Sequence, residues 1–367
     1  MEKNKISHKT LKYAAPLILV VLSCISNYSY ADRSDADTDR NASAAKWKST
    51  SSFLNDIGIP AKKFYAVTID NNNNKWFLTD LGLISYNDEK WTLHNWYMQG
   101  KELRDIAFDA STEGTGFWIA TGSGITSLSS LVETSSASSS YTTDNAAILS
   151  NNVVKVVVGN NKVKWIGTEK GVSAFAGTKW LDVSYDDLYP AVIFQEYPIT
   201  SMATNHAGDS LYIGTKGAGV ARVYKNEVDG ISGASVYAQW GPIIIPSDNV
   251  FSVFIEKNGT KWFGTDMGVA QHTGNNTLEN WVVYTTAEGL VNDYVQSITA
   301  DKNGQLWFGT QGGISVFNGT AFKNFTKDNG LNSNNILCIT VDKNGVVWIG
   351  TDDGVNSFSN ETFTSYR

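Results

Sequence analysis

The sequence predicts an all-β fold: a seven-bladed β-propeller made of four-stranded antiparallel blades. Two observations predict it. One short phrase recurs seven times along the chain, and the apolar residues around each copy alternate with the two-residue period of β-strands. The composition agrees, because 42% hydrophobic and 12% aromatic residues can build a large core, while 32 Gly against 6 Pro favour many tight turns.

The repeated phrase consists of an aromatic residue, an aliphatic or aromatic residue, a small residue, Thr, two variable residues and Gly. Its copies begin at Trp76, Trp118, Trp165, Tyr212, Trp262, Trp307 and Trp348. The spacing between copies ranges from 41 residues (Thr310 to Thr351) to 50 residues (Thr215 to Thr265). A period of this size, with strands inside it, is typical of a propeller blade.

Each unit can be divided into four short strands, as the sixth copy illustrates. There "YVQSITAD" is an inner strand, "QLWFGT" a second, "GISVFNG" a third and "TAFKNFT" an outer strand. We expect the large ring that begins the second strand to fill the wedge between neighbouring blades. The Gly two residues later should leave room for an adjacent strand; it occurs as Gly167, Gly214, Gly264, Gly309 and Gly350.

The segments "DKNG" and "EKNG" join the first two strands of several units. Asp-x-Asn-Gly also occurs in calcium-binding loops, so these segments have two interpretations. A hairpin turn is favoured, because Gly supplies the left-handed position and the bidentate Glu of a calcium loop is missing six residues further on.

The phrases "WFGTDMGV", "WFGTQGGI" and "WIGTDDGV", with the lines "GLVNDYVQSITAD" and "GLNSNNILCITVD", resemble the two-component regulator propeller repeat. The resemblance extends from about residue 60 to the end and is strongest in the last three units. It implies an extracytoplasmic sensor propeller of bacterial hybrid two-component systems, a class often linked to the detection of polysaccharide breakdown products. This chain would be a stand-alone exported form of it.

The N-terminus has the features of an export signal over residues 1–31. Four Lys precede an apolar stretch, and Ser29-Tyr30-Ala31 offers a cleavage site. An alternative is lipobox cleavage before Cys24, which would anchor the chain through a lipidated cysteine. No later segment is predicted to span a membrane. We expect a periplasmic or extracellular protein.

The mature chain divides into a flexible tether and one domain. Residues 32–45 are polar and predicted to be flexible, and residues 46–367 form the propeller. Trp47 lies in a segment that resembles an outer strand but precedes the first inner strand. We therefore predict that residues 46–52 pack on the C-terminal blade, as its outermost strand or as an extra one.

Charge and cysteine content limit the function. Residues 1–31 hold four Lys and one Glu, so removing them changes the formal net charge from −7 to −10. An acidic chain without a basic stretch argues against nucleic-acid binding. Only Cys338 would remain, so no intramolecular disulfide is expected, and this thiol is predicted to be a small core residue.

No catalytic constellation or metal site is predicted. The three His of the mature chain lie in different parts of the repeat: His94 in an outer strand, His206 in a hairpin and His272 at the end of a third strand. They should be far apart, which argues against a zinc site or a His-based triad. No cofactor is expected.

The predicted binding face is the end of the ring where inner strands begin and second strands end. Its constant positions build the frame, so variable positions there can read a ligand, although unconstrained surface turns would look the same. The candidates are Asp80, Trp96, Arg104, Asn152, Glu169, Lys216, Asn249, Asp266, Tyr294, Gln311, Asn335 and Asp352.

Three functions are compatible with the sequence. The favoured one is a non-catalytic exported sensor or ligand-binding propeller, expected to be monomeric, that recognises an oligosaccharide or a peptide. The second is a scaffold for protein–protein interaction in a cell-envelope assembly, with the side surfaces rather than the axis engaged. The third is a lyase or hydrolase acting on a glycan or lactone through carboxylates such as Asp105 and Glu169, since a lactone-opening antibiotic lyase also uses a seven-bladed propeller.

Overall fold

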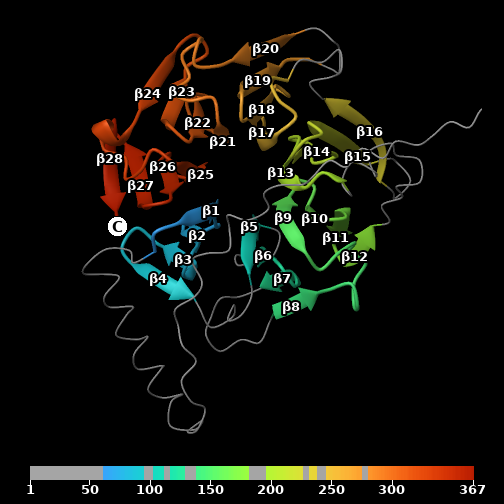
Figure 1. Cartoon of the computed structure of the whole chain (residues 1–367). Helices are drawn as coiled ribbons and strands as arrows, with labels where there is room; N and C mark the ends of the chain where they lie inside the picture. The colour runs from blue at the N-terminus through green and yellow to red at the C-terminus, as the bar shows by residue number, and fades with distance from the viewer. Residues whose placement is uncertain are drawn as a thin grey trace, which may run out of the picture. The chain divides into compact units, whose positions relative to one another are not determined.

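The computed structural model describes residues 61–94, 102–110, 116–128, 138–181, 196–225, 231–237, 245–274 and 280–367. These residues form 28 strands in seven four-stranded antiparallel sheets (Figure 1). The predicted seven-bladed propeller is therefore confirmed. Within the same ranges, no helix has the length and apolar character needed to cross a membrane.

Each blade consists of four consecutive strands, ordered from the inner to the outer edge. Blade 1 contains β1 (Phe64–Ile69), β2 (Lys75–Thr79), β3 (Gly82–Tyr86) and β4 (Trp91–His94). Blade 2 contains β5 (Leu103–Asp109), β6 (Gly116–Thr121), β7 (Gly124–Leu128) and β8 (Ser138–Tyr141). Blade 3 contains β9 (Val153–Val158), β10 (Val163–Thr168), β11 (Gly171–Ala176) and β12 (Lys179–Leu181).

The remaining four blades repeat this order. Blade 4 contains β13 (Ile199–Thr204), β14 (Ser210–Thr215), β15 (Val220–Lys225) and β16 (Ile231–Tyr237). Blade 5 contains β17 (Val250–Ile255), β18 (Lys261–Thr265), β19 (Gly268–His272) and β20 (Trp281–Tyr284). Blade 6 contains β21 (Val295–Ala300), β22 (Leu306–Thr310), β23 (Gly313–Phe317) and β24 (Phe322–Phe325). Blade 7 contains β25 (Ile336–Val341), β26 (Val347–Thr351), β27 (Gly354–Ser359) and β28 (Thr362–Tyr366), and the short 3-10 helix η1 (Lys327–Asn329) precedes it.

The seven inner strands form a closed circuit. Each of β1, β5, β9, β13, β17, β21 and β25 contacts the inner strand of the next blade, and β25 contacts β1. Figure 1 shows these strands around the centre of the ring, with β4, β8, β12, β16, β20, β24 and β28 at its periphery. The beginnings and ends of the inner strands therefore surround the two mouths of the ring.

The hydrophobic core lies between the blades. Seven clusters of buried apolar residues each combine residues of two neighbouring blades. The repeated Trp or Tyr belongs to these clusters, and none of the seven rings is more than 6% exposed. For example, the Trp307 ring lies 5.1 Å from the Phe358 ring of the next blade. This confirms the predicted wedge.

The glycine of the repeated phrase leaves space for the next inner strand, as predicted. A Cβ atom on Gly309 would lie 2.6 Å from Cγ2 of Ile336, and one on Gly264 would lie 2.8 Å from Cγ1 of Val295. Real side chains do not approach this closely. The glycine thus sets the distance between adjacent blades.

The acidic residue that begins a hairpin also orients the indole ring. Oδ1 of Asp301 accepts hydrogen bonds from the backbone N–H groups of Asn303 and Gln305. Its Oδ2 accepts from Nε1 of Trp307 at 3.1 Å. Asp70, Glu256 and Asp342 likewise accept from the indole six residues later, at 2.9, 2.7 and 3.1 Å. With Gly304 at φ +79°, "DKNG" is confirmed as a hairpin.

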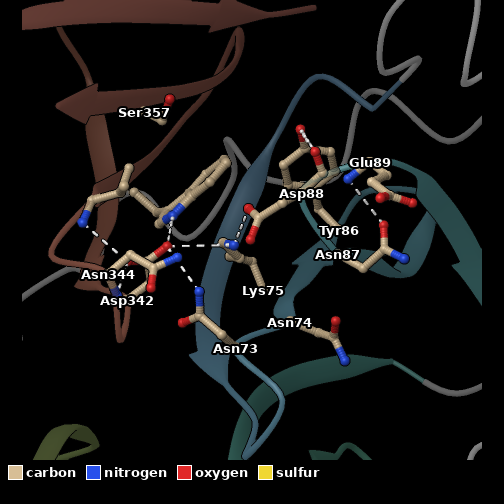
Figure 2. A network of polar contacts seen from close by, with 12 residues as sticks. Asn73, Asn74, Lys75, Tyr86, Asn87, Asp88, Glu89, Asp342, Asn344 and Ser357 are labelled. Atoms are coloured by element: carbon tan, nitrogen blue, oxygen red, sulfur yellow. Dashed lines mark hydrogen bonds and ion pairs between the residues drawn. The ribbon is translucent and has the colours of Figure 1, made fainter.

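Side-chain packing and a buried ion pair join blade 7 to blade 1. The Trp348 ring lies 6.0 Å from the Phe77 ring. The fully buried Lys75 side chain lies between Asp342, 3.4 Å from its Nζ, and Asp88 (Figure 2). Burial by itself would raise the pKa of Asp342. Hydrogen bonds from Trp348 and the backbone, together with the positive charge of Lys75, outweigh burial and hold this pKa below its usual range. The seam therefore has apolar and polar parts.

The predicted strand at residues 46–52 lies outside the described residues. In the part of blade 7 that the structure describes, β28 occupies the outermost position. The packing of residues 46–52 on this blade stays a prediction.

Candidate functional site

The upper rim is defined here as the edge where inner strands begin and second strands end. The antiparallel register brings these points together: Val250 at the start of β17 pairs with Thr265 at the end of β18. The turn residue after each repeated Thr therefore lies beside the beginning of the inner strand. This places the predicted face at one end of the ring.

A bulge near the start of every inner strand shapes this rim. The register shifts by one residue in all seven blades. The extra residue is left outside the regular pairing, and such bulges often redirect a side chain. In four blades its side chain contacts the next blade; these residues are Arg104, Thr200, Phe251 and Gln296.

A polar chain joins blades 2 and 3 on the rim. Nη1 of Arg104 donates to Oδ1 of Asn152, whose Nδ2 donates to Oε2 of Glu169 at 2.6 Å. Ser150 Oγ donates to the other Glu169 oxygen at 2.8 Å. The hydrogen bonds from Asn152 and Ser150 lower the pKa of Glu169. Arg104 also forms an ion pair with Glu102 at 3.0 Å.

The amide–carboxylate pair recurs in blades 5 and 7. Nδ2 of Asn249 donates to Oδ2 of Asp266 at 2.9 Å, and Nδ2 of Asn335 donates to Oδ2 of Asp352 at 3.0 Å. The partners are 17 residues apart in both pairs, as they are in Asn152–Glu169. Burial by itself would raise the pKa of Asp352, but hydrogen bonds from Ser333 and Asn335 outweigh burial and lower it.

Blade 6 has an aromatic pair where blades 3, 5 and 7 have an amide. Tyr294 precedes β21, and its ring stacks on Phe251 of blade 5 with centroids 4.6 Å apart and an angle of 27°. Burial and the negative charge of Asp266 raise the pKa of Tyr294. The tyrosine is therefore a neutral phenol at physiological pH.

The remaining predicted residues have different surroundings. Oδ1 of Asp80 accepts from the backbone N–H groups of Lys62 and Lys63, so it caps the start of blade 1. Lys216 forms an isolated bridge with Asn249. Gln311 is exposed on its turn, and Trp96 lies outside the described residues.

Sequence reasoning missed the partners that hold the rim together. These are the hydroxyls of Ser150, Ser247 and Ser333, each of which accepts from the N–H two residues later, and the bulge residues Phe251 and Gln296. The recurring Ser-x-Asn before an inner strand, with an acid 17 residues after the Asn, was the available signal.

The His and Cys residues lie in the predicted elements. His94 ends β4, His206 lies in the β13–β14 hairpin, and His272 ends β19. Cys338 is buried, its Sγ donates to the carbonyl oxygen of Phe64 at 3.2 Å, and burial raises its pKa to about 12. Among the described residues, no three His, Cys, Asp or Glu side chains gather as a metal site would require.

A cavity of about 820 Å³ lies at the opposite end of the inner strands. Hairpins that join inner to second strands in blades 3 to 7 line it, and none of the predicted site residues does so. The protein thus has a built upper rim and a separate hollow at its other mouth.

These features define a closed seven-bladed propeller with a polar and aromatic rim. Residues 289–312 and 330–353, which lead into and include the first two strands of blades 6 and 7, match the family described as two component regulator propeller. This confirms the resemblance that the repeated phrases carry.

Three solved structures share the fold. The extracellular domain of a hybrid two component system from B. thetaiotaomicron is 21% identical with a TM-score of 0.66, over 83% of this chain and 40% of that one. A streptogramin B lyase is 14% identical with a TM-score of 0.63, over 84% and 95%. PorZ of the Porphyromonas gingivalis type-IX secretion system is 17% identical with a TM-score of 0.60, over 83% and 46%.

These likenesses concern the fold. The chain spans only 40% of the length of the B. thetaiotaomicron domain. No curated protein matches the sequence.

Proposed function

We propose that this chain is a non-catalytic, exported ligand-binding propeller of the sensor type, and that its upper rim recognises an oligosaccharide. One observation carries the proposal: the rim combines three fixed amide–carboxylate pairs with the stacked rings of Phe251 and Tyr294. The matched family and the B. thetaiotaomicron domain support a sensor role.

A sugar needs both kinds of group. Its hydroxyls donate and accept hydrogen bonds, and an ionised carboxylate that already accepts one bond keeps further lone pairs available. Its apolar faces can pack on an aromatic ring. Because the rim side chains already contact one another, little of their freedom would be lost on binding.

The carboxylates named for an enzyme have unsuitable surroundings. The lowered pKa of Glu169 is the opposite of what a general acid needs near neutral pH. Oδ2 of Asp105 accepts from the N–H of Val156, and Oδ1 lies 3.8 Å from Nζ of Lys155. These contacts favour a structural role between blades 2 and 3.

A specific observation favours a cell-envelope protein as the second candidate partner. The described residues include five exposed large hydrophobic side chains. Four of them lie on the upper rim: Leu81, Leu149 and Met267 on turns and connections, and Tyr65 at the bulge of β1. Exposed apolar groups on one face are typical of docking surfaces.

The domain organisation belongs to the same proposal. Residues 1–31 would be the export signal, with cleavage before Cys24 as the alternative, and residues 32–45 the tether of a propeller spanning 46–367. Mass spectrometry of the mature protein from its native cell should find a chain that begins at Asp32. A lipid-modified first residue Cys24 would support the alternative, and an intact Met1 would contradict both.

Calorimetry on the mature chain tests the binding proposal. A panel of oligosaccharides, cell-wall fragments and peptides is titrated, and the best ligand is retested on Tyr294→Ala and Asn152→Ala. We expect an oligosaccharide to bind. Each variant should lower the affinity for it by about 10-fold, which corresponds to a loss of ~1.4 kcal/mol of binding free energy. Lys90→Ala, remote on the β3–β4 turn, is the control. Saturable binding of peptides alone, or binding unchanged in both rim variants, would contradict the proposal.

A further inference from the structure

The second mouth of the ring has its own regular chemistry. The lower mouth is defined here as the cavity of about 820 Å³ at the ends of the inner strands. Its size lies within the range of small-molecule sites, roughly 300 to 1,000 Å³. The hairpins of five successive blades contribute residues to it, among them Asn160, His206, Lys257, Lys302 and Asp342.

The second residue of the hairpin is basic in three successive blades. In blades 5, 6 and 7 this residue is Lys257, Lys302 and Lys343, and all three are exposed. Lys257 and Lys302 line the cavity, and Lys343 directly follows the lining residue Asp342. We call the three lysines the basic arc. In blade 4 the same position holds His206. The arc stands out because the whole chain has a formal net charge of −7.

Neutral backbone acceptors hold two of the three lysines of the arc in place. Nζ of Lys302 donates to the carbonyl oxygen of Lys343, and Nζ of Lys343 donates to the carbonyl oxygen of Asn71 at 2.7 Å. A similar link joins blades 3 and 4, where Nδ2 of Asn160 donates to the His206 carbonyl oxygen at 2.9 Å. An ammonium group has three N–H donors, so each lysine keeps donors for a ligand.

The nearby carboxylates are already engaged elsewhere. Glu256, Asp301 and Asp342, the first residues of the same hairpins, accept from the indoles of their own blades. Asp342 also pairs with the buried Lys75. Within the described ranges, no carboxylate forms an ion pair with a lysine of the basic arc. The ammonium groups of the arc are therefore not engaged in short-range ion pairs.

We propose that the lower mouth binds a multivalent anion, a compact ligand with two or more carboxylate, sulfate or phosphate groups. The lysines come from consecutive blades, so they can contact separate anionic groups of one molecule. Charge-assisted hydrogen bonds from lysine to an anionic group are stronger than hydrogen bonds between neutral groups. The site is separate from the upper rim, and its ligand differs in charge from a neutral oligosaccharide.

Calorimetry of the mature chain at low ionic strength tests this inference with citrate, pyrophosphate and inorganic sulfate as probes, and with glycerol as a neutral control. We expect saturable binding of citrate or pyrophosphate, weakened by at least about 20-fold in Lys257→Gln/Lys302→Gln/Lys343→Gln. The matched control is Lys90→Gln/Lys179→Gln/Lys327→Gln, which removes the same charge from exposed positions outside this mouth and should bind normally.

Two further variants keep the result interpretable. Lys257→Gln alone breaks no hydrogen bond described for that side chain, so this variant should fold. We expect its affinity for citrate to be about 5-fold lower. Tyr294→Ala on the upper rim should leave citrate binding unchanged, which separates this site from the oligosaccharide site. The inference is overturned if no polyvalent anion binds the natural protein, or if the two triple variants weaken binding equally.

Discussion

Glycine in the repeated phrase is required by a contact with the neighbouring blade, and Gly309 illustrates this. A Cβ atom there would lie 2.6 Å from Cγ2 of Ile336 and 3.0 Å from Cδ1 of Ile339, both of which are buried in blade 7. The contact cannot be relieved by moving an exposed side chain. The two blades would have to separate.

Gly309→Ala should lower the free energy of unfolding by about 1 to 3 kcal/mol, because an extra methyl group is forced into a packed core. Gly122→Ala is the matched control, since the nearest atom to its Cβ would be an oxygen of the exposed Glu102 carboxylate at 3.0 Å, and Arg104 Nη2 and Glu102 Cβ would lie at 3.5 Å. Denaturant unfolding measures both. Equal stability of the two variants would show that the glycine does not set the blade spacing.

His94 is a residue whose protonation should affect stability. Its Nε2 lies 2.9 Å from Ser85 Oγ, its ring lies 4.8 Å from the Trp76 ring, and burial lowers its pKa to about 4. Between this value and the unfolded pKa of about 6.5, the unfolded chain binds more protons than the folded one. Acid therefore favours unfolding through this group.

The protein should lose up to ~3 kcal/mol of stability through His94 as the pH falls from 7 towards 4. Gln does not titrate, so the His94→Gln variant should lose less stability than the natural protein over the same pH range, by that amount. Thermal unfolding across this pH range provides the comparison. Identical pH profiles for the two proteins would contradict the assigned pKa.

At the scale of the strand and hairpin, the seam between blades 7 and 1 depends on Lys75 of β2. Its ammonium group lies 3.4 Å from Asp342, beside Asp88, and 5.2 Å from the centre of the Trp348 ring. Its side chain has no exposed surface. Removing one partner of such a pair leaves a buried charge uncompensated.

Lys75→Met should destabilise the protein by roughly 2 to 4 kcal/mol, because Asp342 loses its buried counterion. Lys90→Met, at an exposed position of the same blade, should change stability by less than about 0.5 kcal/mol. Denaturant unfolding of both variants measures the difference. A loss below 1 kcal/mol for Lys75→Met would show that the seam is held by apolar packing alone.

The strands were predictable because their signals are local. The aromatic ring, the Gly and the Thr of each phrase recur in one order, and the hairpin residues of "DKNG" carry their own turn chemistry. Specific polar pairs between blades were not predictable in this way. Arg104 and Asn152 are 48 residues apart and belong to unlike segments, so nothing in either segment indicates the pair.

The rim was predicted better than the lower mouth for the same reason. Asn152, Glu169, Asn249, Asp266, Asn335 and Asp352 lie at fixed repeat positions and form the pairs observed. In the sequence, the lysines of "EKNG" and "DKNG" are recognisable only as parts of turns. The gathering of Lys257 and Lys302 at one cavity depends on ring closure, which a single repeat does not display.

At the scale of the whole ring, each mouth has a distinct composition. The upper rim carries amide–carboxylate pairs and stacked rings, whereas the lower mouth carries the basic arc. Both depend on the closed circuit of seven inner strands, which fixes side chains from distant parts of the chain beside one another. A repeat architecture thereby provides two faces that can differ independently.

The central claim is that a ligand binds where the inner strands begin. Hydrogen–deuterium exchange of the mature chain with and without its bound oligosaccharide tests this most directly. We predict slower exchange at the starts of β9, β17, β21 and β25 and in the turns that follow β10, β18, β22 and β26. Protection confined to outer strands such as β4 and β20, or to the lower hairpins, would contradict the claim.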